Sequence, residues 1–298
     1  MAVIILLGAG ASYGSKGVEP YAPPLGNQLF PKLLEESATA RSMPEEIKKL
    51  FEDNFEAGMA AYYEHSNGNI MSFQRELAEY LAKFQPKKDN IYLQLIEKIG
   101  NSSVIYSSLN YDLLFEQSAI ESGFGITYSD IPEKQMLRLL KFHGSCNFWP
   151  EMGGTVLKGC QISGSGRADI QAPIKALDQQ ATLNKCKTED SLSPAIAMFA
   201  VGKKVKISPD FVENQYAMWK QQVSKSTKVF VVGVRVHEVD EHIWALLGKI
   251  KGKVTYFGFE SDKDEFNAWK KNHNKRNAYF YKSDFQGAVD TISSLCKR

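Results

Sequence analysis

The stretch AVIILLGAGAS, residues 2–12, decides the fold of this chain. Its first six residues are all apolar, and a short continuous apolar run is typical of a strand buried on both faces of a parallel sheet. The five residues after the run are all small: Gly8, Ala9, Gly10, Ala11 and Ser12. Small residues let backbone amides approach a phosphate, and a serine hydroxyl can donate a further hydrogen bond. The stretch therefore predicts a buried first strand followed by a phosphate-binding turn, or by a tight turn with no ligand.

Five further runs of strand length, largely apolar, follow at residues 104–109, 137–142, 229–232, 254–257 and 278–281. Helical patterns alternate with them, at residues 112–122, 209–224 and 285–295. This alternation predicts an α/β fold with a Rossmann-like, mostly parallel sheet and helices on both faces. Ligands of such sheets bind beyond the carboxyl ends of the strands. The residues that follow each run are therefore the candidates for function.

The segment between the first and second runs is longer than a crossover connection requires. Helical spacing predicts three or four helices there, at residues 29–34, 45–55, 73–84 and 91–99. Because one helix is enough for a crossover, we interpret residues 27–100, approximately, as an inserted helical module. A second, variable region covers about 151–206, with glycine loops at 153–154 and 164–166 and short strands around 156–162. We expect the whole chain, 1–298, to form a single domain.

Composition and charge exclude several classes of protein. The 298 residues include 36 Lys and Arg against 34 Asp and Glu, a balance of +2 that is too even to indicate nucleic acid or an anionic membrane as a partner. No apolar run approaches the roughly 20 residues of a membrane helix. The apolar start, Met1 to Leu7, lacks the basic leader of a secretory signal. We therefore expect a cytoplasmic protein.

The cysteines do not have the spacing of a zinc site. They are Cys146, Cys160, Cys186 and Cys296, and no two of them form a CxxC pair. Structural zinc sites made of thiolates normally contain such pairs, although four thiolates distant in the sequence can also meet in space. We therefore expect no zinc ribbon, and we interpret the cysteines as reduced, buried apolar residues.

A second group of possible metal ligands lies at residues 237–242, with the sequence HEVDEH. Its two histidines, His237 and His242, are five residues apart and not four as in HExxH. That spacing places them on different faces of a helix. The sequence favours the solvated start of a helix, and we expect no metal site.

Polar residues follow the second and third runs. Asn110 comes at the end of the second, with its amide facing the ligand edge, and Asp112 fits as the cap of the next helix. Alternatively, both residues only cap and turn the chain. His143 follows the third run beside Gly144, which lets a ligand come close. His143 is a candidate general base, although a lone histidine is more often a satisfied structural residue.

The later runs end in two further candidate contacts. Gly233 and Arg235 follow the run at 229–232, and the guanidinium fork can bind a phosphate or a carboxylate, or can be a plain surface arginine. Glu260 follows the run at 254–257. A carboxylate there can accept hydrogen bonds from both hydroxyls of an adenosine ribose and would repel a 2′-phosphate, which favours NAD over NADP.

Taken in order, these segments resemble the motifs of the sirtuin family. GAGAS at 8–12 is similar to the first phosphate turn of that family, and NYDLLFE at 110–116 is similar to its asparagine–aspartate motif. FHGS at 142–145 resembles the histidine–glycine motif, and VVGVRVHEVDEHI at 231–243 resembles the late glycine turn. The chain most resembles the divergent bacterial sirtuin-like domains of antiviral defence systems. In these a proline–leucine–glycine stretch follows the first turn, as at residues 24–26 here.

Two departures distinguish the chain from deacylating sirtuins. It lacks their paired CxxC motifs, and it lacks the cofactor-loop arginine near a proline–aspartate–phenylalanine stretch. In addition, Arg235 stands where the family usually has a small hydroxyl residue. The resemblance therefore implies cleavage of NAD, as substrate and without a metal, to nicotinamide and ADP-ribose. It implies Asn110 and His143 as catalytic residues, and as NAD-binding residues the turn at 8–12 with Asp112, Gly233, Arg235 and Glu260.

Two alternatives remain open at this point. The same residues could serve an NAD-dependent deacylase or ADP-ribosyltransferase, or a nucleotide-sensing module without catalysis. The resemblance also implies a toxic effector of abortive infection, and a free NADase would harm its own cell. We expect control by a partner protein of the same defence system or by homo-oligomer assembly, with the module at 27–100 as the contact surface.

Overall fold

The computed structural model describes residues 2–100, 104–152, 169–197, 205–237 and 240–296. Seven strands form the main sheet: β1 (Val3–Leu7), β4 (Val104–Ser108), β5 (Gly125–Thr127), β6 (Met136–Leu140), β9 (Lys228–Val232), β10 (Lys253–Gly258) and β11 (Ala278–Lys282). Their order is β11-β10-β9-β1-β4-β6-β5, and every neighbouring pair is parallel. The six predicted strands and the Rossmann-like α/β class are confirmed. The edge strand β5 has only three residues, too few for a recognisable pattern.

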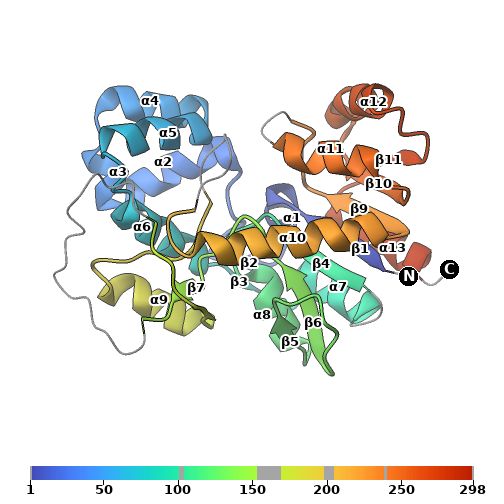
Figure 1. Cartoon of the computed structure of the whole chain (residues 1–298), viewed down its shortest axis with the longest axis horizontal. Helices are drawn as coiled ribbons and strands as arrows, with labels where there is room; N and C mark the ends of the chain where they lie inside the picture. The colour runs from blue at the N-terminus through green and yellow to red at the C-terminus, as the bar shows by residue number, and fades with distance from the viewer. Residues whose placement is uncertain (1, 101–103, 153–168, 198–204, 238–239, 297–298) are drawn as a thin grey trace.

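The central strand β1 sends alternate side chains into two different cores. The first core contains Val3, Ile5 and Leu7 with residues of α7 (Ile91–Ile99), α8 (Leu114–Glu121) and α13 (Phe285–Cys296). The second contains Ile4 and Leu6 with residues of α10 (Pro209–Lys225), α11 (Glu241–Lys249) and α12 (Lys263–Asn272). Helices therefore cover both faces of the sheet, as predicted (Figure 1). Burial on both faces explains why every residue of β1 is apolar.

Between α1 and β4 the described residues form six helices, more than the three or four predicted. They are α2 (Gly26–Glu36), α3 (Ala38–Ser42), α4 (Glu45–Asp53), α5 (Phe55–His65), α6 (Met71–Ala82) and α7. The helix predicted at 45–55 is present as α4 but ends at Asp53, and the separate helix α5 was not predicted. Asn54 leaves helical geometry, with φ −155°, and its side chain accepts hydrogen bonds from the Glu56 and Ala57 amides at the start of α5. The five residues of α3 are too few to show a helical period.

The helices α2 to α6 gather beside the sheet, whereas α7 covers one of its faces (Figure 1). An aromatic cluster holds the inserted helices together, with Phe30 stacked on Phe51 at 4.2 Å between ring centroids and Phe73 5.6 Å from Phe51. These rings belong to the same core as Val3 and Ile5 of β1. The module and the sheet are therefore one packing unit.

The variable region at 151–206 is described only in part. The loops predicted at 153–154 and 164–166, the strands predicted at 156–162, and Cys160 lie outside the described residues. The described part contains β8 (Ile174–Ala176), which pairs antiparallel with β7 (Phe148–Pro150), and α9 (Gln179–Thr188). Burial raises the pKa of the Cys146 thiol well above its usual value and that of Cys186 to about 12. Both are therefore protonated at neutral pH, which suits buried apolar residues.

Two short elements complete the region around the first turn. The helix α1 (Ala9–Tyr13) follows β1 directly, and β2 (Val18–Glu19) then pairs antiparallel with β3 (Gln85–Pro86). The loop after α1 is thus paired with the segment between α6 and α7. Within the described residues, none of the helices has the length and apolar character needed to cross a bilayer.

Candidate functional site

The candidate residues all follow strands that are neighbours in the sheet. Glu260 follows β10, Gly233 and Arg235 follow β9, residues 8–12 follow β1, Asn110 and Asp112 follow β4, and His143 follows β6. Because β10-β9-β1-β4-β6 are consecutive and parallel, these five loops lie at the same edge of the sheet. The strand spacing of about 4.8 Å puts the loops after β1 and β6 roughly 10 Å apart.

The two glycine turns, at 8–12 and at Gly233, are packed against each other. The Gly8 amide donates to Val232 O and the Gly10 amide donates to Gly233 O, each at 3.0 Å. Gly233 has φ +67°, and a Cβ there would lie 2.1 Å from the Ala11 nitrogen. A Cβ on Gly8 would lie 2.4 Å from Gly233 O. The glycines are thus required by the contact between the turns, and phosphate binding by the amides of this turn stays a prediction.

Substituting Gly233 by alanine is expected to destabilise the fold. The positive φ alone costs about 1–3 kcal/mol in a residue with a side chain, and the Cβ would also push the 8–12 turn away. The matched control is Gly26→Ala, because a Cβ there meets nothing within 4 Å. Urea unfolding of both variants checks this, and equal stabilities would contradict it.

The amide of Asn110 joins the loop after β4 to the first turn. Its Nδ2 donates to Gly8 O at 2.9 Å and to Ser12 Oγ at 2.8 Å, and the Ser12 hydroxyl also lies 2.9 Å from the Tyr92 hydroxyl. The carbonyl acceptor at Gly8 fixes which end of the amide is the nitrogen. No hydrogen bond from a described residue reaches Asn110 Oδ1. The amide is therefore rigidly oriented, with its oxygen left for a ligand or solvent.

Asp112 caps the next helix from a position one residue earlier than a regular cap. The helix α8 begins at Leu114 and not at Asp112 as predicted, because Asp112 Oδ1 accepts the Leu114 amide at 3.1 Å. Asp112 is buried, and this burial raises the pKa of its carboxyl above the usual value. The Lys141 ammonium acts in the opposite direction, as do hydrogen bonds from the Leu114 amide and the Ser12 hydroxyl.

We expect Asp112→Asn to raise stability at neutral pH. A folded-state pKa above the unfolded one means that Asp112 stabilises the fold only at low pH and loses that contribution as pH rises through the folded pKa. The asparagine oxygen can still accept the Leu114 amide without a buried charge. Thermal melts from pH 7 down to about 4, where free Asp titrates, should show the advantage of the variant shrinking. An advantage that grows toward acid would contradict the sign.

The sequence interpretation missed a buried ion pair behind this loop. Lys141 Nζ donates to Glu116 Oε1 at 2.9 Å and to Asp112 O at 2.7 Å. The Lys141 amide donates to Gln215 Oε1, not to a neighbouring strand, so β6 ends at Leu140 and not at 142 as predicted. A lysine near the end of a largely apolar run was the available signal. Its partner on α8 was not visible in the sequence.

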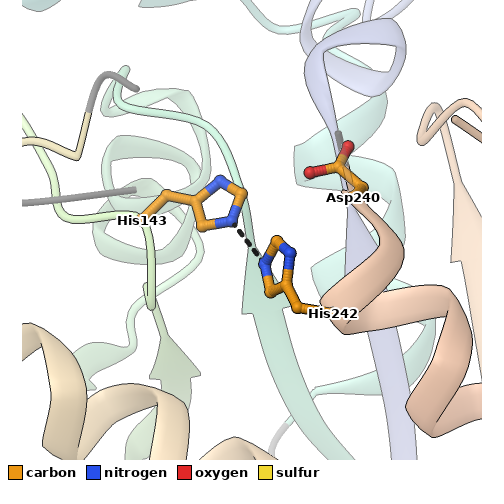
Figure 2. Close-up of side chains that lie close together, drawn as sticks. All are labelled: His143, Asp240 and His242. Carbon is orange, nitrogen blue, oxygen red and sulfur yellow. Dashed lines mark hydrogen bonds between the residues drawn. The ribbon is translucent and has the colours of Figure 1, made fainter. Parts of the chain in front are cut away.

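His143 is buried and lies against a second histidine. Its Nε2 is 3.3 Å from Nε2 of His242, in the first turn of α11, and Asp240 lies beside them (Figure 2). One possible ligand atom from each of these three residues lies within 4.8 Å of the others. The prediction of no metal site was based only on the spacing of residues 237–242. The partner of His242 is 99 positions earlier in the chain.

The loop after β6 also lies beside the loop after β4. The Cys146 amide donates to Tyr111 O at 3.0 Å, which links the loops that carry His143 and Asn110. Gly144 has φ +81°, and a Cβ there would lie 2.1 Å from Ala195 O. This glycine makes room for the chain at 195–196, whereas the sequence suggested room for a ligand.

The side chains of Arg235 and Glu260 form ion pairs with charged residues at the surface of this chain. Arg235 binds Glu265 of α12 through two hydrogen bonds, of 2.6 and 3.2 Å. Glu260 opens the short helix η2 (Glu260–Asp262) and pairs with Lys263 at 3.0 Å, which lowers the pKa of its carboxyl. Neither side chain forms a hydrogen bond or ion pair with Asn110, Asp112 or His143. Their roles in binding NAD stay predictions.

Comparison with family models and with curated proteins gives no match. Among solved structures, the chain is similar to one described as "The Structural basis of Sirtuin Substrate Affinity". The alignment covers 99% of this chain and 93% of that chain, with 11% identity and a TM-score of 0.48. The fold class itself is established by the sheet topology above.

Proposed function

We propose that this protein hydrolyses the nicotinamide–ribose bond of NAD. The observation that carries the proposal is Asn110, whose amide nitrogen is fixed by Gly8 O and Ser12 Oγ while Oδ1 receives no hydrogen bond from the described chain. It lies at the edge where parallel sheets bind nucleotides, in the loop next to the one that carries His143. The sirtuin-like motifs support the same substrate.

The chemistry requires stabilisation of a cation and removal of a proton. As the C1′–N bond breaks, nicotinamide leaves as a neutral molecule and positive charge builds on the ribose. Asn110 Oδ1 stabilises that charge or holds the attacking water. Water adds to C1′, and the His143 imidazole takes its proton.

The residues that bind NAD hold the substrate in position for the reaction. In this proposal the turn at 8–12 holds the pyrophosphate, which keeps the reacting carbon at Asn110 and converts binding into rate. Asp112 binds the ribose or orients the loop. Gly233, Arg235 and Glu260 complete the contact with the adenosine half.

The direct test is to incubate the purified protein with NAD and to identify products by liquid chromatography with mass detection. Nicotinamide with ADP-ribose supports hydrolysis, and a cyclic product would replace hydrolysis by cyclisation. An acetyl-ADP-ribose formed only with an acetyl-lysine peptide would favour deacylation. If NAD stays intact, a binding titration follows, and absence of NAD binding would overturn the proposal.

Control by assembly or by a partner is part of the same proposal. The activity would deplete cellular NAD in an antiviral response, so it must be silent until triggered. Leu50 of α4 is a large apolar side chain of the inserted helices that stays exposed, at 41%. Deleting the inserted helices would open the shared core, so the test is light scattering of Leu50→Glu beside the parent chain. An unchanged mass and unchanged activity would argue against this surface.

A further inference from the structure

Three side chains that commonly bind metals meet at the carboxyl edge of the sheet. His143 comes from the loop after β6, while Asp240 and His242 come from the start of α11 (Figure 2). One ligand atom of each lies within 4.8 Å of the other two. The hydroxyl of Tyr216 donates to His242 O at 3.2 Å, which supports the first turn of α11 from α10.

The distances are close to those of a metal centre. Tetrahedral zinc with bonds of about 2.0–2.2 Å places its ligand atoms roughly 3.3–3.6 Å apart. The two Nε2 atoms are 3.3 Å apart. One carboxylate oxygen of Asp240 lies within 4.8 Å of a ring nitrogen of each histidine, so it is placed to be the third ligand. A shared proton explains the present contact, and a metal ion would replace that proton between the same two nitrogens.

The charge and chemistry of the group select the kind of ion. Two imidazoles and one carboxylate suit zinc and its neighbours, whereas magnesium and calcium prefer oxygen ligands. The amino end of α11 carries a partial positive charge that opposes a cation. Asp240 supplies the negative charge that offsets it. The carboxylate is therefore required for binding.

We infer that His143, Asp240 and His242 bind one divalent transition-metal ion of the zinc class, with a fourth position open to water. This site goes beyond the proposed NAD cleavage and does not depend on it. Where the proposed function holds, the ion occupies the lone pair of His143 Nε2 and withdraws this residue from proton transfer. Zinc is then an inhibitor of the hydrolase.

The test measures binding without reference to activity. The metal-free full-length protein is titrated with Zn²⁺ in competition with a chromophoric chelator. We expect about one ion per chain, and at least tenfold weaker binding in His242→Ala and Asp240→Asn. The matched control is His237→Ala, an exposed histidine three residues before Asp240, which should bind as the parent does. Cobalt bound at the site should give the strong visible absorption of a tetrahedral centre, lost in the same two variants.

Each outcome decides the inference. Absence of zinc binding by the parent chain overturns it, as does binding that His242→Ala and Asp240→Asn leave unchanged. Equal losses in His237→Ala would assign the ion to a different set of ligands. Circular dichroism melts separate lost binding from lost folding. An NAD assay with added zinc follows: a protein that binds zinc and never cleaves NAD would retain the metal site and lose only the proposed function.

Discussion

Replacing Asn110 by alanine is expected to lower kcat for nicotinamide release by about 10²–10³-fold, the usual cost of removing one preorganised polar group from a transition state. The variant loses the Oδ1 atom that, in the proposed mechanism, stabilises the developing cation. It also loses the two hydrogen bonds that hold Gly8 O and Ser12 Oγ, so KM should rise as well. Steady-state kinetics with chromatographic detection of nicotinamide measures both quantities.

The matched control for Asn110 is Tyr92→Phe. The Tyr92 hydroxyl touches Ser12 Oγ at 2.9 Å and Asn110 Nδ2 at 3.4 Å, and its removal leaves the amide in place. We expect this variant to keep kcat within a few-fold. If Asn110→Ala turns over NAD as fast as Tyr92→Phe does, Asn110 has no catalytic role.

Replacing Lys141 by methionine is expected to cost about 3–5 kcal/mol of unfolding free energy, because it leaves the Glu116 charge buried without its partner. The side chains of Lys141 and Glu116 are only 1% and 8% exposed. Glu116 Oε2 already lacks a hydrogen-bond partner within the described chain. The variant also loses the donor to Asp112 O, so activity should fall together with stability. Urea unfolding measures the first effect.

Two further variants define the origin of that loss. Lys32→Met removes an exposed ammonium paired with Glu35 and should leave stability unchanged, because surface pairs contribute little. The double variant Lys141→Met/Glu116→Leu removes both buried charges and should recover most of the stability. A Lys141→Met protein as stable as Lys32→Met would show that burial of the pair has no energetic consequence.

The sequence was sufficient to predict the sheet and the edge at which the candidate residues lie. The strands β1, β4, β9 and β10 are buried on both faces, so their residues form largely apolar runs that are visible without the structure. The exceptions were short or capped elements. The strand β5 is too short to show a period, and the break at Asn54 depends on a side-chain hydrogen bond to the backbone.

The structure gives several candidate residues neighbours that the sequence could not show. Gly10 was predicted to admit a phosphate, and its amide binds Gly233 O. Arg235 was predicted either to bind a phosphate or carboxylate or to be a surface arginine, and its guanidinium pairs with Glu265. In both cases the residue type indicated the chemistry of the interaction. The partner lay on another strand or helix, which no local pattern can specify.

The sequence by itself determined which polar residues follow the strands and that they gather at one edge, because parallel strands all present their carboxyl ends there. Only the tertiary structure decided which of those residues touch. The contact of Asn110 with Gly8 spans 102 positions, and that of His143 with His242 spans 99. Such contacts depend on the order of strands in the sheet and on how α11 packs over it. Those are set by the summed burial of many side chains, and hydrophobic burial has no direction that a short motif could encode.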